Sequence, residues 1–242
     1  MKEVLYTIPL NDAINEDGEC PFCCVERDVE KDILDFVLGP GSSYMEYDVR
    51  SATDAEGFCR DHFQKMFKYG NTLGNAWILK THYMRINEQL ENETKHFKYG
   101  KAGLFGKNKD SENSMVSWIR AKESSCYVCK RFDETYLRYI ATFFHMYKTE
   151  PDFMDRLSKS KGFCLSHFGD ICEYADKYLD EKQRKEFYPK MFEIMKANFE
   201  RLQEDINWMV EKFDYRNKDA DWKNSKDAVQ RGMQKLKGGI YG

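Results

Sequence analysis

The chain contains few prolines and no long apolar run. Only 5 of its 242 residues are proline, and no stretch reaches 18 uncharged apolar residues in a row. A helix needs about 20 apolar residues to cross a bilayer, so the sequence predicts no membrane-spanning segment. The first 20 residues are interrupted by charged and polar side chains and lack the apolar core of a signal peptide. We therefore expect a cytoplasmic protein that does not associate with membranes.

A strong charge of either sign is also absent. The 38 basic and 41 acidic residues leave a formal net charge of −3, which provides no general attraction to nucleic acid or to anionic lipid. Charged residues nevertheless make up 33% of the chain. Such a share of charge, with so few prolines, favours long helices with one face in solvent. The length is sufficient for one large domain or two small ones with a buried core.

The chain does contain eight cysteines, and six of them belong to a pattern that occurs twice. Each copy consists of a CxxC motif followed, about 35 residues later, by a GFCxxHF motif. The offset between copies is 106 residues for CxxC and 105 for CxxH, which we interpret as a tandem duplication over about 17–97 and 123–206. Cytoplasmic cysteines more often hold metal or carry out redox chemistry than form structural disulfides.

The segments between the motifs have the apolar periodicity of helices. Apolar residues recur at helical spacing over 24–38 and again over 131–147, and Gly39-Pro40-Gly41 should end the first of these helices. Longer helical patterns cover about 73–97 and 181–213, and no stretch shows sustained strand alternation. The sequence predicts an all-α protein with two similar helical subdomains in tandem and a C-terminal helix.

The motifs of each copy can supply four ligands to one metal ion. Residues three apart lie on one face of a helix, and a CxxC at a helix start places two sulfurs beside free backbone N–H groups. We expect each copy to form a helical hairpin closed by a Cys₃His site that binds a structural zinc ion. Four protein ligands leave no position for a reactive water, so no catalytic residue is expected. The predicted ligands are Cys20, Cys23, Cys59 and His62 in the first copy, and Cys126, Cys129, Cys164 and His167 in the second.

Other interpretations of the cysteines stay open. They could be buried core residues, redox dithiols, or ligands of an iron–sulfur cluster that includes a histidine, and a Cys₃His ligand set accepts either zinc or iron. A thioredoxin-like site would need a surrounding βαβ pattern, which is absent. Cys24 and Cys172 are not duplicated and are left out of the sites; the residue aligned with Cys172, Phe67, is predicted to be a core position. The other histidines, His82, His96 and His145, also have no counterpart.

Two further segments lie outside the repeat. Residues 95–109 hold five lysines, three glycines and no acidic residue. This composition favours a solvated linker over a nucleic-acid contact. We therefore divide the chain into an N-terminal unit (1–97), a basic linker (98–112) and a C-terminal unit (113–242). Near the end, Trp222 should anchor a helix whose apolar face packs on the body or binds a partner, with Ala228, Val229, Met233 and Leu236 on that face.

The sequence resembles a known family at these motifs. "IPLNDAI" followed by "CPFC", the paired CxxH motifs and the tail "DWKNSKDAVQRGMQKL" are similar to a bacterial family of unknown function found in anaerobic gut and soil bacteria. Some of its members carry the automatic label of ABC transporter substrate-binding protein. The resemblance covers essentially the whole chain and implies no activity, substrate or partner.

The sequence thus predicts a zinc-binding helical protein that acts by binding a protein or a small molecule rather than by catalysis. One alternative is a redox or metal-dependent enzyme, with an iron–sulfur cluster as one form of its cofactor. A nucleic-acid-associated regulator that uses the basic linker is the other, although nucleic acid is not the expected partner. No oligomeric state is predicted.

Overall fold

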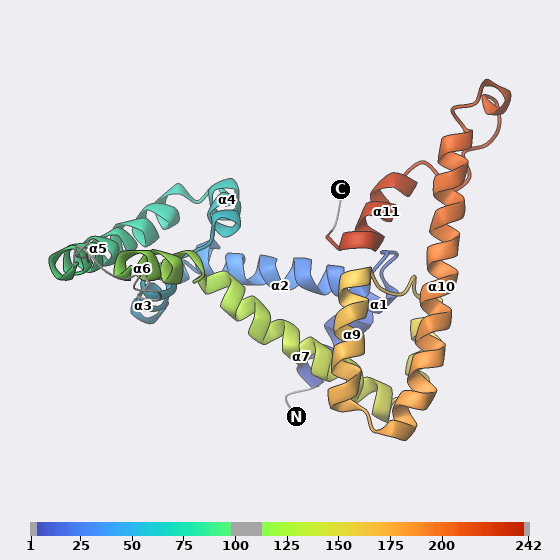
Figure 1. Cartoon of the computed structure of the whole chain (residues 1–242), viewed down its shortest axis with the longest axis horizontal. Helices are drawn as coiled ribbons and strands as arrows, with labels where there is room; N and C mark the ends of the chain where they lie inside the picture. The colour runs from blue at the N-terminus through green and yellow to red at the C-terminus, as the bar shows by residue number, and fades with distance from the viewer. Residues whose placement is uncertain (1–3, 98–112, 240–242) are drawn as a thin grey trace, which may run out of the picture. The chain divides into compact units, whose positions relative to one another are not determined.

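The computed structural model describes residues 4–97 and 113–239, and these residues form helices and no strands (Figure 1). The all-α prediction is confirmed. Two short 3₁₀ helices, Ser43–Met45 and Tyr215–Asn217, accompany the α-helices. The latter are α1 (Val4–Asn15), α2 (Pro21–Leu38), α3 (Tyr47–Glu56), α4 (Arg60–Tyr69), α5 (Thr72–His96), α6 (Ser114–Glu123), α7 (Tyr127–Thr149), α8 (Phe153–Lys159), α9 (Leu165–Tyr178), α10 (Glu181–Glu211) and α11 (Ala228–Lys237).

The helix boundaries follow local signals in the sequence. The helix α2 begins at a proline, which suits the first helical position, and ends at Leu38, just before Gly39-Pro40. The expected long helices are present as α5 and α10. Asp180 and Gln183 form a capping box at the start of α10. The described helices include none with the length and apolar character needed to cross a membrane. The predicted linker, 98–112, lies outside the described residues.

The chain folds into two compact units whose boundaries fall inside α2 and α7. Unit 1 contains residues 1–29 and 134–242, and unit 2 contains residues 30–133. The division we drew from the sequence placed the boundary at the linker. Each of the two sequence halves, 1–97 and 113–242, instead contributes residues to both units.

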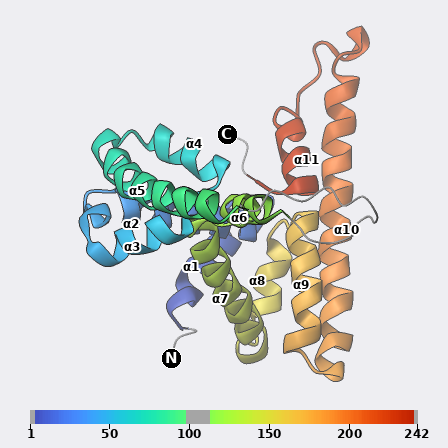
Figure 2. The same cartoon turned by 60° about the vertical axis from the view of Figure 1, so that its left-hand side comes forward.

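The core of unit 1 is aromatic. Phe143 packs edge-to-face with Phe153, Phe163 and Phe187 at centroid separations of 5.1, 5.9 and 6.3 Å. The helices α9 and α10 run side by side (Figure 2), and the Tyr188 hydroxyl donates to the Cys172 carbonyl across them at 3.1 Å. The helix α11 packs against both α9 and α10.

The face that α11 buries differs from the predicted one. Ala228, Gly232 and Lys235 are buried, whereas the predicted apolar residues Val229, Met233 and Leu236 are 46%, 55% and 53% exposed. Of the four residues predicted to form the buried face of this helix, only Ala228 is buried. A lysine occupies the interior because its ammonium group donates to two backbone carbonyls, those of Glu19 and Lys161.

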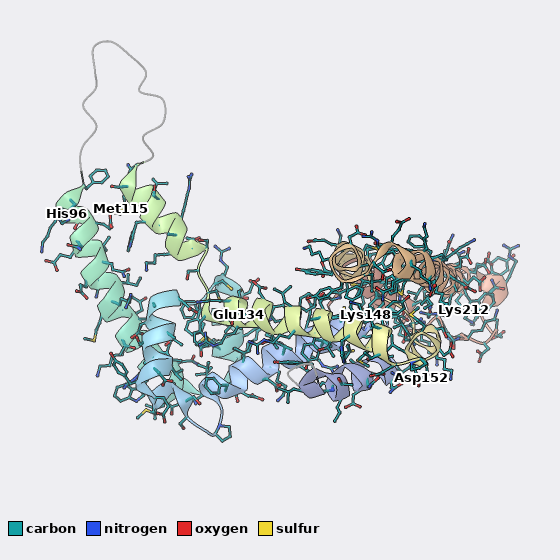
Figure 3. The ribbon with its side chains drawn as sticks, turned by 90° about the horizontal axis from the view of Figure 1, so that it is seen from below. His96, Met115, Glu134, Lys148, Asp152 and Lys212 are labelled. Atoms are coloured by element: carbon teal, nitrogen blue, oxygen red, sulfur yellow. The ribbon has the colours of Figure 1, made fainter. Side chains whose placement is uncertain are left out.

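Unit 2 has a smaller core in which α2 and the start of α7 pack with α4 and α5. Buried Leu38, Phe58, Ile78 and Tyr127 belong to this cluster. The helix α5 also contacts α3 and α6, and Figure 3 shows His96 near the end of α5 beside Met115 near the start of α6. Phe67, which the sequence suggested as a core position, is 83% exposed, because α4 turns its Met66 side inward.

Candidate metal centres

All four cysteine motifs lie at helix N-termini. Cys59 and Cys164 are the N-cap residues of α4 and α9, and Cys20 and Cys126 directly precede α2 and α7. The second member of each motif follows three residues later, on the first helical turn, where it faces the same side as the first. Helix N-termini carry partial positive charge and free N–H groups, which stabilise thiolates.

The structure brings the eight predicted ligands together in two groups of four. We name them centre 1, formed by Cys20, Cys23, Cys164 and His167, and centre 2, formed by Cys59, His62, Cys126 and Cys129. The predicted set of residues is complete, but the predicted pairing is wrong. Each centre combines the CxxC of one sequence copy with the CxxH of the other, and so neither copy closes as a hairpin on its own.

Helix lengths explain this exchange. The helix α2 has 18 residues and spans about 27 Å from Cys20 to its end, at about 1.5 Å per residue. The helix that follows it, α3, has 10 residues and returns only about 15 Å. In the second copy the 23 residues of α7 are followed by the 7 residues of α8. A CxxH motif after such a short return helix does not reach the start of its own long helix.

Centre 1 is built within unit 1 from the starts of α2 and α9. The Nδ1 atom of His167 lies 3.3 Å from Cys20 Sγ, 3.6 Å from Cys23 Sγ and 3.2 Å from Cys164 Sγ. The sulfurs of Cys23 and Cys164 are 4.0 Å apart. All four residues are buried, with the three cysteines no more than 2% exposed and the histidine 3% exposed.

Centre 2 is built within unit 2 from the starts of α4 and α7 and has nearly the same geometry. The Nδ1 atom of His62 lies 3.1 Å from Cys59 Sγ, 3.3 Å from Cys126 Sγ and 3.4 Å from Cys129 Sγ. The sulfurs of Cys59 and Cys129 are 3.9 Å apart. Cys59 and Cys129 are only half-buried, however, unlike any ligand of centre 1.

These distances fit one tetrahedral ion in each centre. Zinc bonds of about 2.3 Å to sulfur and about 2.0–2.1 Å to nitrogen imply ligand separations of about 3.8 Å between sulfurs and about 3.6 Å between sulfur and nitrogen. The observed separations are 3.9–4.0 Å and 3.1–3.6 Å, and all ligand atoms of a centre lie within 4.8 Å of one another. Both groups can therefore hold a metal ion.

Each histidine is oriented by a carboxylate that the sequence analysis did not identify. The Nε2 atom of His167 lies 3.1 Å from Glu26, and that of His62 lies 3.1 Å from Glu30. Such a carboxylate fixes the ring with Nδ1 toward the three sulfurs and raises the basicity of the imidazole. Both glutamates belong to α2, and Glu26 follows Cys23 by three residues, a spacing that places the two on one helix face. That spacing is the signal that could have identified it.

The pKa shifts at centre 1 favour a thiolate at Cys164 and a positive charge on His167. Burial opposes the charge on His167, but hydrogen bonds with Cys164 and Cys20 outweigh it and raise its pKa to about 12. Hydrogen bonds from Cys20 and Cys23 hold the pKa of Cys164 far below its ordinary range. The pKa of Cys23 rises to about 12, mainly through its hydrogen bond to Cys164. A metal ion that binds here must displace the remaining protons.

Centre 2 has the same arrangement in weaker form. Burial opposes the charge on His62, but hydrogen bonds with Cys126 and Glu30 raise its pKa to about 10. Burial also opposes the Cys126 thiolate, and the hydrogen bond with His62 nevertheless lowers its pKa to about 6. Burial raises the pKa of Cys129 to about 12. Because protons leave both centres when metal binds, apparent metal affinity should increase with pH.

The remaining residues of the GFCxxHF repeat also have roles in the structure. Gly57 and Gly162 have φ angles of 64° and 69°, a left-handed conformation that favours glycine. Phe58 and Phe163, which follow them, are buried in the two cores. CYVC lacks the proline of CPFC, and the Tyr127 N–H at that position donates to the Gly57 carbonyl at 2.9 Å. This bond ties the two motifs of centre 2 together.

The unduplicated cysteines and histidines lie outside both groups. Cys24 is buried beside the Cys20 carbonyl, with its sulfur 3.6 Å from that oxygen, and Cys172 is half-buried on α9. His82 and His96 contact backbone carbonyls through Nδ1, at 3.1 and 2.7 Å. None of them belongs to a group that could hold a metal ion in the described part of the chain.

The chain belongs to a family of unknown function, DUF6062, which matches it over residues 1–242. The resemblance seen in the sequence is thereby confirmed. Searches of the curated proteins and of the solved structures found no match. The chemistry of the two centres is thus the most specific information on function.

Proposed function

We propose that this protein binds two zinc ions that serve as structural clamps, and that it acts as a non-catalytic binding or scaffold protein. The observation that carries the proposal is the pair of four-ligand groups with the spacing of a single tetrahedral ion. Three thiolates and one imidazole complete such a shell. Because no ligand position remains for water or substrate, the ions stabilise the fold and activate nothing.

The same spacing argues against an iron–sulfur cluster. A cluster distributes its protein ligands over two or more irons, which requires them to lie further apart than around one ion. Here all four ligand atoms of each group lie within 4.8 Å. Among metals that bind as a single ion, zinc is the one that typically has three thiolates and one imidazole as ligands in structural sites.

The position of the ligands supports the role of a clamp. Each group joins the starts of two helices that are distant in sequence: α2 and α9 in centre 1, and α4 and α7 in centre 2. Binding free energy of an ion at such a place becomes folding free energy. All eight cysteines are free, which fits a reducing compartment and supports a cytoplasmic location.

Metal analysis of the full chain tests the proposal. Protein purified without chelator and without oxygen should contain two zinc ions per chain and be colourless. Replacement of zinc by cobalt should give the visible absorption of tetrahedral cobalt with thiolate ligands, with an intensity that corresponds to two ions. A brown chain that contains iron and sulfide, or a chain with a single ion, would contradict it.

A further inference from the structure

The two centres differ in the exposure of their cysteine residues. In centre 1 no cysteine is more than 2% exposed, and the residue at the end of α11, Gly238, lies against it. A Cβ added to Gly238 would lie 3.5 Å from Cys164 Sγ and 3.7 Å from Cys23 Sγ. In centre 2, Cys59 and Cys129 are half-buried. Solvent can therefore reach two cysteines of centre 2 but hardly those of centre 1, although the two centres have the same types of residue.

A cavity in unit 2 reaches one cysteine of centre 2. It has a volume of about 500 Å³ and lies in unit 2 between the start of α4, α5 and α6. Cys59 is part of its wall, beside the apolar side chains of Phe58, Ile86 and Trp118. A small molecule that enters this cavity meets Cys59, one of the four residues of centre 2.

The charges around the cavity balance. Arg60 and Lys122 line it together with Asp61 and Glu123. Because two cations and two anions line the cavity, an anionic reagent is not attracted to it overall. A small neutral molecule should therefore enter at least as readily as an anion. Hydrogen peroxide is a neutral two-electron oxidant of nearly the size of water.

We infer that Cys59 and Cys129 form an oxidant-reactive pair, through which hydrogen peroxide releases the ion of centre 2 while centre 1 stays loaded. This inference depends on the proposed zinc function. Oxidation of cysteine follows thiolate character and exposure, and the first oxidised sulfur is resolved by a neighbouring thiolate. As ligands of a zinc ion both cysteines would be thiolates. They are the two cysteines of centre 2 that are only half-buried, and their sulfurs lie 3.9 Å apart.

The reaction balances with peroxide as the only oxidant. The Cys59 sulfur attacks one peroxide oxygen, the O–O bond breaks, and the hydroxide that leaves takes a proton to form water. The Cys129 thiolate then attacks the resulting Cys59 sulfenic acid, forms the S–S bond and displaces a second hydroxide, which is also protonated. Two electrons pass from the two sulfurs to peroxide. Cys126 and His62 would then be the only ligands left at centre 2, too few to hold a zinc ion in a tetrahedral shell.

The test uses the zinc-loaded full chain, hydrogen peroxide and a chromophoric zinc chelator. We expect one of the two ions to leave at least about tenfold faster than the other. Mass spectrometry of a non-reduced digest should then show a Cys59–Cys129 disulfide. Simultaneous release of both ions, retention of both, or a disulfide between other cysteines would overturn the inference. A chain with fewer than two zinc ions before oxidation would instead refute the proposed function.

A variant that narrows the cavity tests the route. Ile119 lines the cavity, so Ile119→Trp should slow zinc release several-fold and leave zinc content unchanged. Val116 lies on the same helix, is similarly exposed at 37% and is not part of the cavity wall, which makes Val116→Trp the matched control. Equal rates for the two variants would show that the oxidant does not enter through this cavity.

Discussion

Centre 1 and centre 2 have the same donor atoms and nearly the same distances, yet they lie in different surroundings. The His167 ring of centre 1 is flanked by Phe22 and Tyr136, each at a centroid distance of 5.8 Å, and Gly238, directly after α11, lies against the sulfurs of Cys23 and Cys164. Centre 2 has a cavity at Cys59 and a carboxylate, Glu30, that also pairs with Lys65. The two centres can therefore hold the same kind of ion, and they differ in the residues that surround the ligand atoms and in what can reach them.

The largest difference should appear when each histidine is removed. His167→Ala and His62→Ala should each lose one ion, since three thiolates alone do not complete the shell. His167→Ala should lower the melting temperature by about 10 °C or more, at about 2–4 °C per kcal/mol for a chain of this size. His62→Ala should lower it less, because its centre is partly exposed and lies in the smaller core. Calorimetry with metal analysis measures both effects.

Cys24→Ala provides the control for this pair. Cys24 is 1% exposed but lies outside both ligand groups, so its replacement should cost only about 1 kcal/mol for the small cavity and keep two ions. If both histidine variants retained two ions and melted like the parent, the ligand assignment would be wrong.

The second prediction removes the cover of centre 1. Lys235 is 1% exposed, and its ammonium group donates to the carbonyls of Glu19 and Lys161, which holds α11 in place. Lys235→Met removes the donor to both carbonyls, one buried and one partly buried, and should cost about 2–4 kcal/mol. With α11 loosened, peroxide should release both zinc ions instead of one. The exposed Lys237 on the same helix supplies the control: Lys237→Met should behave like the parent chain. Retention of the centre 1 ion in Lys235→Met would show that burial in the core, and not α11, protects it.

The sequence was sufficient to predict the helices and the eight residues that gather in the two centres, because periodicity and motif spacing are local properties. Which CxxC motif meets which CxxH motif, in contrast, depends on contacts between distant parts of the chain. The two copies are chemically equivalent, so separation along the chain was the only guide, and it favoured Cys20 with Cys59. The lengths of the helices argue against the pairing of Cys20 with Cys59. The long helix that ends at residue 38 is followed by a helix of about half its length, which does not bring the chain back to Cys20.

The face of α11 shows a second limit of sequence patterns. Hydropathy assigns lysine to solvent and leucine to the core, yet Lys235 is buried and Leu236 is 53% exposed. The ammonium group is satisfied by carbonyls from segments about 74 and 216 residues away. No pattern within the helix reveals partners at that distance. Glu30 was missed for a similar reason, since it contacts a histidine ring of another helix.

The smallest expected effect comes from replacing Glu26 or Glu30, the carboxylates that orient the histidines. These replacements compare the two centres without removing any of the eight candidate ligands. Glu26→Ala should weaken zinc binding only at centre 1, and Glu30→Ala only at centre 2, each by about 10–100-fold. The loss should be larger for Glu26, because Glu30 also pairs with Lys65, which already neutralises part of its charge toward His62. Competition with a chromophoric chelator resolves the two affinities, and Glu26→Gln and Glu30→Gln, which keep a hydrogen-bond acceptor, should recover part of each loss. Loss at the wrong centre, or equal loss at both, would mean that these glutamates act on overall stability and do not orient the imidazoles.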